Sequence, residues 1–185
     1  MIFMKKNKIT ISTGKYRELY FAVAWCEGIV ISCSLGRKNE KNALDDVNIF
    51  VNKSESNAIP YVKFSSNETE LVKNVGKLYY GKNTEFNPLE HDNKENFSFK
   101  VLQEVSKIPT GEVKTYKEIA EKINSKAYRA VGNALNKNPI PIIIPCHRVV
   151  RSDFSLGGFR GGSEMKKELL KREGVQIRGN KVIRD

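Results

Sequence analysis

The stretch from residue 138 to residue 150 constrains the fold of this chain more than any other segment. It reads Asn-Pro-Ile-Pro-Ile-Ile-Ile-Pro-Cys-His-Arg-Val-Val. Its three prolines fix φ and lack the backbone N–H that a helix interior needs, so a regular helix is excluded. Isoleucine favours strands and buried positions. We therefore predict a buried, extended segment that leads out of the core to Cys146 and holds this residue rigidly.

Cys146 is followed directly by His147 and Arg148, an order that suits nucleophilic chemistry. The thiolate is the reactive form of cysteine, and a neighbouring histidine or cation lowers the pKa of the thiol. On a regular strand, however, neighbouring side chains point to opposite faces. Cys146 and His147 could then share a proton only across a turn or through a water molecule. The alternative, a buried structural cysteine beside a core histidine, stays open at this point.

Length and composition favour a folded protein that is neither secreted nor embedded in a membrane. The 185 residues, 39% of them hydrophobic, suffice for one large domain or two small ones. No apolar run reaches the roughly 18 residues needed to cross a bilayer, and the N-terminus lacks the apolar stretch of a secretory signal. The odd number of cysteines, at Cys26, Cys33 and Cys146, indicates free thiols in a reducing compartment. We therefore predict a cytoplasmic protein with no membrane partner.

The positive charge of the chain is concentrated in its C-terminal half. Residues 97–185 carry 18 Lys and Arg against 9 Asp and Glu, a net charge of +9 out of a total of +11. Such a surface suits a polyanion, because neutralised phosphates release condensed counterions. Solvated lysines on an ordinary basic protein are the alternative interpretation.

The N-terminal part of the sequence predicts a small sheet with a helix. Residues 19–25 and 29–35 are rich in β-branched and aromatic residues around the turn dipeptide Glu27-Gly28, which is typical of a hairpin. Further strands are expected at residues 10–13 and 61–64, and a helix at residues 69–80. The polar stretch 82–96 predicts a boundary between an N-terminal α/β domain, residues 1–90, and a C-terminal domain, residues 91–185.

Short helices follow the boundary. They are expected at residues 97–108, 116–123 and 127–136, with Thr115 as the N-cap of the second. The last two helices, joined by a short polar break, indicate a helix-turn-helix whose second helix carries Tyr128, Arg129, Asn133 and Lys137. An ordinary packed helix pair has the same pattern.

A glycine-rich segment and a last helix lie beyond the cysteine. Residues 155–162 contain four glycines, which permit either a close backbone approach to a planar ligand or a plain surface loop. The next helix is expected at residues 165–173, with Ser163 as its capping candidate. Glu173 lies at the C-terminal end of this helix, where the helix dipole disfavours a carboxylate. We therefore expect Glu173 to be paired and functional.

The segment from Pro145 to Val149 resembles the acceptor-site signature of the O6-alkylguanine-DNA alkyltransferases, also called methylated-DNA–protein-cysteine methyltransferases. Further matching segments occur in the family's order over residues 97–175. They are Gly111-Glu-Val-Lys-Thr-Tyr116, Tyr128-Arg-Ala-Val-Gly-Asn133, Asn138-Pro-Ile-Pro141, Gly157-Gly-Phe159 with Gly161-Gly162, and Leu169-Leu170 through Glu173-Gly174.

The resemblance implies a two-domain α/β fold. The N-terminal domain would be a small β-sheet with a helix, and the C-terminal domain mostly helical, with a winged-helix-like helix-turn-helix and a buried acceptor cysteine. It also implies DNA repair by a single, irreversible transfer of the O6-alkyl group of guanine onto Cys146. The expected partner is double-stranded DNA that contains O6-alkylguanine; no cofactor is expected, and we expect a monomer.

The resemblance further implies roles for individual residues. Cys146 would be the alkyl acceptor, His147 would take its proton through a water molecule, and Glu173 would orient the imidazole. Asn138 would brace the turn that holds the site, and Tyr116 would lie over the flipped guanine. The implied DNA-binding residues are Thr115, Tyr128, Arg129, Ala130, Gly132 and Asn133, with the helix in the minor groove and Arg129 in the base stack. The implied base pocket comprises Val149, Gly157, Phe159 and Arg160.

Some positions depart from the family pattern. Phe159 and Arg160 stand where some relatives have tyrosine and serine, which removes those hydroxyl groups. Cys26 is near a position that binds zinc in some relatives, but Cys33 and His91 do not complete an evident set of ligands, so no metal is predicted.

Two other functions would also use residues of this motif or of this family. A cysteine hydrolase using Cys146 and His147 lacks a second histidine at a suitable place, because His91 lies in the polar linker. A non-catalytic DNA-binding regulator of the same family would lack the acceptor cysteine, which is present.

Overall fold

The chain folds into two compact units. Its structure, a computed structural model, describes residues 9–51, 61–63, 68–84, 86, 89–90 and 96–183. The N-terminal unit comprises residues 1–79, 83–94 and 139–143, and the C-terminal unit comprises residues 80–82, 95–138 and 144–185. The linker around the predicted boundary between residues 90 and 91 lies largely outside the described residues, so that boundary stays a prediction.

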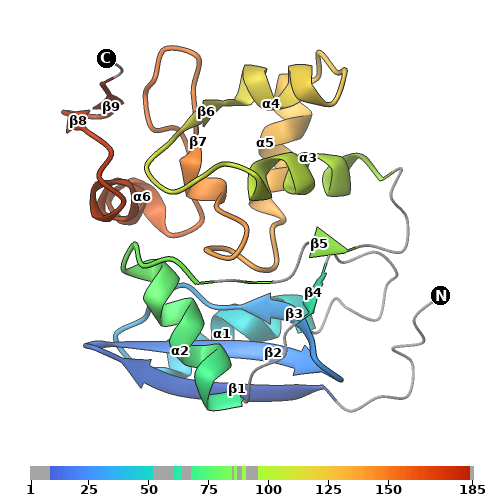
Figure 1. Cartoon of the computed structure of the whole chain (residues 1–185), viewed down its shortest axis with the longest axis vertical. Coiled ribbons are helices and arrows are strands. Elements are labelled where there is room, and N and C mark those ends of the chain that lie inside the picture. Colours follow the sequence, from blue (N-terminus) through green and yellow to red (C-terminus); the bar gives the residue numbers. More distant parts are fainter. Residues whose placement is uncertain are drawn as a thin grey trace. The chain divides into compact units, whose positions relative to one another are not determined.

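A five-stranded antiparallel sheet forms the N-terminal unit (Figure 1). In order across the sheet, its strands are β1 (Thr10–Tyr16), β2 (Leu19–Cys26), β3 (Ile29–Cys33), β4 (Tyr61–Lys63) and β5 (Leu89–Glu90). The predicted hairpin is confirmed, because β2 pairs with β3 around Glu27 and Gly28, which both have positive φ. The predicted strands at residues 10–13 and 61–64 are β1 and β4; residue 64 lies outside the described residues.

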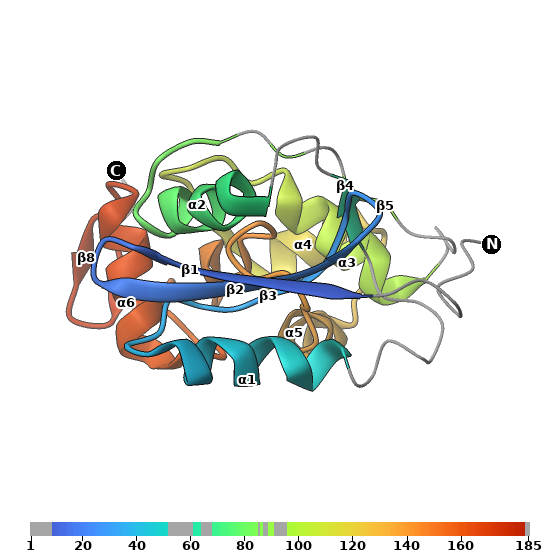
Figure 2. The ribbon, with the colours of Figure 1, turned by 90° about the horizontal axis from the view of Figure 1, so that it is seen from below.

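The N-terminal sheet carries a helix on each face (Figure 2). Helix α1 (Glu40–Val51) packs Ala43 and Val47 against one face of β2 and β3. Helix α2 (Glu68–Tyr79) lies on the other face, where the Tyr79 ring meets the Phe21 ring edge-on at 5.4 Å. Consecutive side chains of β2, from Phe21 to Ala24, are buried. Because strand side chains alternate between faces, both faces of β2 are therefore covered. The sequence predicted α2 and missed α1.

A segment from far along the chain, residues 139–143, belongs to the N-terminal unit. The Pro139 carbonyl accepts hydrogen bonds from Cys33 N at 3.0 Å and from Ser32 Oγ at 3.1 Å. The Cys33 thiol donates to the Pro141 carbonyl at 2.9 Å. These buried bonds fix the segment that leads toward Cys146, and no pattern in the sequence predicted them.

The C-terminal unit is mostly helical (Figure 1). Its elements are α3 (Phe97–Ser106), β6 (Lys114–Thr115), α4 (Tyr116–Lys122), α5 (Tyr128–Asn136), the 3₁₀ turn η1 (Cys146–Arg148), β7 (Val149–Val150), α6 (Gly162–Arg172), β8 (Ile177–Arg178) and β9 (Lys181–Val182).

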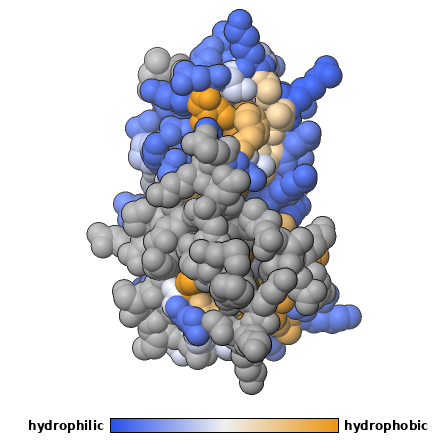
Figure 3. Space-filling model, turned by 90° about the vertical axis from the view of Figure 1, so that its right-hand side faces the viewer, coloured by the Kyte–Doolittle hydropathy of each residue, from blue (hydrophilic) through white to orange (hydrophobic). Residues whose placement is uncertain are grey.

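Hydrophilic residues cover much of the described surface on the side of α3 and α5, around a small hydrophobic patch (Figure 3). None of the helices in the described ranges combines the length and the apolar character of a membrane span.

Helices α4 and α5 are joined by a short connection, as predicted. Thr115 caps α4: its hydroxyl accepts from Glu118 N at 3.1 Å, and the Glu118 carboxylate accepts from Thr115 N at 2.6 Å. This reciprocal pair satisfies two otherwise unpaired backbone donors and confirms the predicted N-cap. Asn124 then takes a positive φ of 55°, which reverses the chain before α5. The mixed α/β architecture with a helical C-terminal half agrees with the prediction.

The passage into Cys146 is buried as predicted, but it is not extended. Ile140 and Ile144 are buried, yet Ile142 has a φ of 74° and the following residues form turns. The prolines cannot donate to a strand ladder, so turns satisfy the backbone instead. Regular pairing resumes only at Val149–Val150, which pair in parallel with Lys114–Thr115.

The last helix also differs from the prediction. Helix α6 begins at Gly162, not near Met165, and Gly161 occupies its N-cap without a side-chain bond, so Ser163 is not the cap. The first turn therefore includes residues that the sequence assigned to the glycine-rich loop. After α6, β8 and β9 form a hairpin that packs into a core of Val113, Val150, Leu156, Leu170, Val175 and Val182.

Candidate active site

Cys146 lies at the start of η1, with its side chain almost wholly buried. Asn138, which is 2% exposed, donates from Nδ2 to the Ile144 carbonyl at 3.0 Å and to Cys146 Sγ at 3.4 Å. One amide group therefore fixes the turn before the cysteine and also places an N–H dipole on the sulfur. Because that dipole favours a negative charge on sulfur, it partly offsets the cost of forming a buried thiolate.

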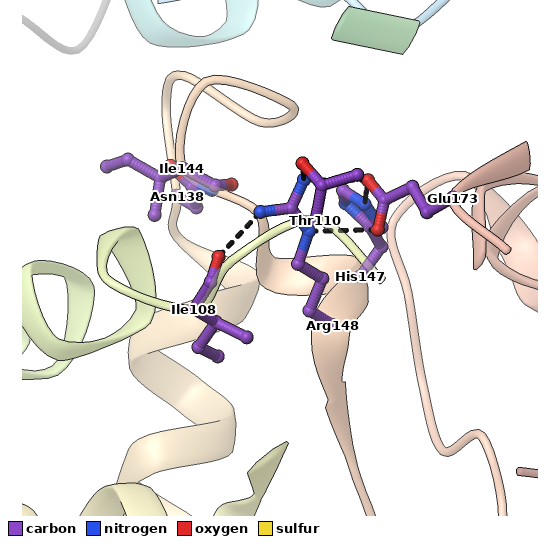
Figure 4. Close-up of polar contacts among 7 residues, drawn as sticks. All are labelled: Ile108, Thr110, Asn138, Ile144, His147, Arg148 and Glu173. Atoms are coloured by element: carbon purple, nitrogen blue, oxygen red, sulfur yellow. Dashed lines mark hydrogen bonds and ion pairs between the residues drawn. The ribbon is translucent and has the colours of Figure 1, made fainter. Parts of the chain in front are cut away.

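His147, the residue after Cys146, forms a pair with Glu173 (Figure 4), and both side chains are buried. His147 Nε2 lies 2.9 Å from Glu173 Oε1. Burial raises the pKa of Glu173, but hydrogen bonds from His147 and Arg148 outweigh it and lower the pKa to about 2. An ionised carboxylate only accepts hydrogen bonds, so neutral His147 carries its proton on Nε2. Its Nδ1 is buried and has no hydrogen-bond partner among the described residues, which leaves its lone pair available.

Arg148 holds the same carboxylate from the other side. Its Nε and Nη2 donate to the two oxygens of Glu173 at 2.9 and 2.8 Å, and Nη1 donates to the Ile108 carbonyl at 2.6 Å. Nη2 also donates to Thr110 Oγ1 at 3.1 Å (Figure 4). The planar guanidinium thus neutralises a buried anion and links it to the end of α3. The sequence placed Arg148 in the motif but gave it no positioning role.

Lys166 is a second residue that the sequence analysis missed. It lies on the buried face of α6 at 0% exposure, and its Nζ donates to the Val149 carbonyl at 2.6 Å and the Gly158 carbonyl at 3.3 Å. Burial lowers its pKa to about 8, against the opposing influence of Cys146. Its position three and four residues before the buried Leu169 and Leu170 was the available signal, since that spacing places it on the same helix face.

Burial and the neighbouring groups have opposite effects on the protonation of Cys146 and His147, and burial is the larger effect. Burial raises the pKa of the Cys146 thiol, while Asn138, Lys166 and Arg160 lower it. Burial lowers the pKa of His147, while Glu173 raises it. Desolvation therefore favours a neutral thiol and a neutral imidazole, whereas the surrounding groups are arranged to stabilise a thiolate and an imidazolium.

Tyr116, the first residue of α4, is half-buried at this site. Burial and the nearby Cys146 raise the pKa of its hydroxyl, and Arg151 opposes them. A Cβ added to Gly157, which has a φ of 68°, would lie 3.4 Å from Tyr116 Oη, and one added to Gly132 would lie 3.8 Å from Tyr116 Cε1. The ring therefore lies between the glycine-rich loop and α5, and both glycines keep the backbone close to it.

The four residues predicted to line a base pocket surround the same turn. Val149 is buried at the end of η1, and Gly157 faces the Tyr116 hydroxyl. The Phe159 ring meets the His147 ring edge-on, with centroids 6.3 Å apart. Arg160 is near enough to Cys146 to lower the pKa of its thiol. A cation therefore acts on the sulfur from the position where some relatives have a serine.

The residues predicted to bind DNA lie on and before α5. Tyr128 is 42% exposed, and Arg129 and Asn133 are exposed as well. Ala130 and Gly132 are partly buried. Thr115 is buried and its hydroxyl caps α4, so its side chain places the helix pair.

The three cysteines are free thiols. Cys26 and Cys33 lie on neighbouring strands of the N-terminal unit, and His91 lies outside the described residues. Within the described part of the chain, no three His, Cys, Asp or Glu residues are grouped so that they could hold a metal ion.

A family model and two relatives of known name are similar in sequence to this chain. Residues 96–175 match the family described as 6-O-methylguanine DNA methyltransferase, DNA binding domain. The methylated-DNA–protein-cysteine methyltransferase of Sulfolobus acidocaldarius is 47% identical over 113 residues, which cover 61% of this chain and 72% of that protein. The protein of the same name from Archaeoglobus fulgidus is 39% identical over 121 residues, which cover 62% and 81% of the two chains.

Similar solved structures cover both units of the chain. The O6-methylguanine-DNA methyltransferase of Pyrococcus kodakaraensis matches with a TM-score of 0.63 and 25% identity, covering 91% of this chain and all of the other. Mycobacterium tuberculosis OGT, solved in complex with DNA, matches with a TM-score of 0.59 and 27% identity, covering 88% and 91% of the two chains.

Proposed function

We propose that this chain, which belongs to the methylated-DNA–protein-cysteine methyltransferase family, repairs alkylated DNA by moving the O6-alkyl group of guanine irreversibly onto Cys146. The observation that carries the assignment to Cys146 is the buried chain of contacts around it. Asn138 donates to its sulfur, and the adjacent His147 is held by the ionised Glu173. These contacts place a proton acceptor, His147, next to Cys146 in the chain and a hydrogen-bond donor on its sulfur.

The first step moves a proton from Cys146 to His147. A water molecule between Sγ and the buried Nδ1 would carry the proton, because Nε2 is already bound to Glu173. The imidazolium that forms lies against an ionised carboxylate, and the thiolate lies near the Asn138 amide and the Lys166 ammonium. Both new charges therefore meet opposite charges or dipoles that are already in place.

The second step is an in-line displacement at the alkyl carbon. The thiolate forms a carbon–sulfur bond while the bond from carbon to guanine O6 breaks, and the electron pair of that bond stays on the base. The Tyr116 hydroxyl would donate a hydrogen bond to the departing guanine and stabilise its developing negative charge. A thioether resists hydrolysis under mild conditions, so each protein molecule acts once.

The guanine reaches a buried sulfur only if it leaves the DNA stack. We assign this step to α4 and α5 as a helix-turn-helix that enters the minor groove, with the exposed Arg129 filling the space left by the base. The net charge of +9 on residues 97–185 and the resemblance to an OGT solved with DNA support this assignment. Recognition would then depend on groove shape and on the lesion, as the resemblance to the family implies.

The fate of a labelled methyl group tests the function against its two alternatives. With duplex DNA carrying tritiated O6-methylguanine, the label is expected to appear on protein in a form that resists acid and heat. A cysteine hydrolase acts on acyl groups and a non-catalytic binding protein transfers nothing, so either would leave the label in the DNA. Cys146→Ser is expected to bind the same duplex without acquiring label.

A further inference from the structure

Arg151, directly after β7, is an exposed arginine on a hydrogen-bonded turn. Its N–H donates to the Ser155 carbonyl at 2.9 Å, and its carbonyl accepts from Phe154 N at 2.9 Å. Asp153 stabilises the same turn by accepting from the Ser155 N–H at 3.1 Å and from its hydroxyl at 2.7 Å. The β8–β9 hairpin supports the turn through a bond from Leu156 N to the Asn180 carbonyl at 3.1 Å. These hydrogen bonds therefore fix the backbone from which the Arg151 side chain extends.

This turn brings Arg151 to the edge of the acceptor site. A Cβ on Gly157 would lie 3.4 Å from Arg151 Cγ and 3.4 Å from Tyr116 Oη, so the two side chains flank the same point. The charge of Arg151 also lowers the pKa of the Tyr116 hydroxyl and of Lys166. Tyr116 is thus close enough to both Cys146 and Arg151 for their charges to act on its hydroxyl.

The Arg151 guanidinium forms no ion pair among the described residues. The nearest acidic residue in sequence, Asp153, pairs with Lys181 at 3.5 Å and accepts from Ser155. Arg151 differs in this respect from Arg148, whose guanidinium forms an ion pair with Glu173. An exposed guanidinium with no ion pair in the described ranges, on a hydrogen-bonded turn, is suited to bind an oxyanion through two parallel N–H donors.

We propose that Arg151 binds the phosphodiester adjacent to the extruded guanosine and holds that nucleotide against Tyr116. The proposal rests on the proposed function, because it requires a guanine to enter beside Tyr116. A base in that position leaves its sugar and phosphate at the edge of the site, where Arg151 is exposed. Arg129 on α5 would then replace the base in the duplex, while Arg151 retains the nucleotide outside it.

Two substrates and two arginines separate this role from a role in folding or in chemistry. Arg151→Ala is expected to slow single-turnover repair of duplex O6-methylguanine about tenfold, as the loss of one solvent-exposed contact between a guanidinium and a phosphate predicts. It should slow the reaction with free O6-benzylguanine, which has no phosphate, far less than the duplex reaction, because only the influence of Arg151 on Tyr116 and Lys166 is lost there. The slope of log binding constant against log salt concentration should fall by about one. The matched control, Arg178→Ala, removes an exposed arginine from β8 and should leave the repair rate near that of the native protein.

A methylphosphonate scan identifies the phosphate itself. Duplexes in which single phosphates near the lesion are made uncharged should include one that slows the native protein as much as Arg151→Ala does. That duplex should cause no further loss in the variant. Equal sensitivity of both proteins to every methylphosphonate, or an equal loss on the free base, would overturn the proposal. Failure of the native protein to methylate Cys146 would instead contradict the proposed function, so the two failures are distinguishable.

Discussion

Glu173 Oε1 lies 2.9 Å from His147 Nε2, and this bond determines which ring nitrogen of His147 is able to accept a proton. Glu173 occupies the C-cap of α6. The helix dipole disfavours a carboxylate at this end of a helix, so other contacts must stabilise the charge of Glu173. The two donors that hold it, His147 and Arg148, follow Cys146 in the chain. The acceptor turn and the end of α6 therefore act as one unit.

Replacing Glu173 by Gln should slow repair of duplex DNA and reaction with free O6-benzylguanine to the same extent. The variant keeps the shape of the side chain but removes the charge that stabilises the imidazolium of His147. Single-turnover rates on both substrates measure the effect. A loss confined to duplex DNA would mean that Glu173 serves DNA binding and not the thiol.

The Glu173→Gln variant should also be less stable, because the buried Arg148 loses its counter-charge. Removing one partner of a buried ion pair costs about 3–5 kcal/mol. Chemical denaturation near neutral pH measures the difference in the free energy of unfolding. Glu168→Gln, at an exposed position on the same helix, is the matched control and should change little.

The stability of the native protein should fall in acid as Glu173 takes up a proton. Its pKa is lowered from 4.5 to about 2, so the ionised form stabilises the fold above pH 4.5, and this contribution is lost as the pH falls through 2. In Glu173→Gln that part of the acid dependence should be missing. Unfolding curves at several acidic pH values compare the two proteins; parallel pH profiles would contradict the account.

Lys166→Met should raise the pH at which Cys146 becomes reactive. The Lys166 ammonium lowers the pKa of the buried thiol, so its removal leaves desolvation less opposed. The rate of Cys146 alkylation by iodoacetamide, followed against pH without DNA, reports the change by peptide mapping. Lys167→Met, one residue further along α6 and more exposed, is the control. An unchanged profile in Lys166→Met would limit Lys166 to a structural role through its two carbonyl contacts.

Arg129→Ala should separate base extrusion from chemistry. If the side chain fills the gap left by the guanine, it stabilises only the extrahelical state in duplex DNA. Repair of duplex O6-methylguanine should then slow far more than reaction with the free base. Equal losses on both substrates would show that Arg129 supports the fold or the nucleophile.

The sequence predicted those elements that have a local cause. The β2–β3 hairpin follows from its turn dipeptide, and α4 begins at the Thr115 cap. Helix α1 was missed because its buried positions, Ala43 and Val47, give a weak periodic signal among polar residues. The face of the sheet that it covers exists only after the hairpin has formed.

The parts of the site that depend on distant contacts were less predictable. The turns before Cys146 are stabilised by bonds from Ser32 and Cys33, more than 100 residues earlier, and no local rule anticipates them. The pairing of Glu173 was anticipated from its unfavourable place on the helix. Lys166 was missed because a lysine on a helix normally lies on the solvent-exposed face. Only its spacing from Leu169 and Leu170 indicated that it is buried.

The most direct test of the account is the intact mass of the protein after reaction with excess duplex O6-methylguanine. We expect each chain to gain one methyl group in place of one hydrogen, located on Cys146 by peptide mapping, with the number of repaired guanines equal to the number of protein molecules. Repair of many lesions per chain, or a methyl group on Cys26 or Cys33 instead, would contradict the central claim.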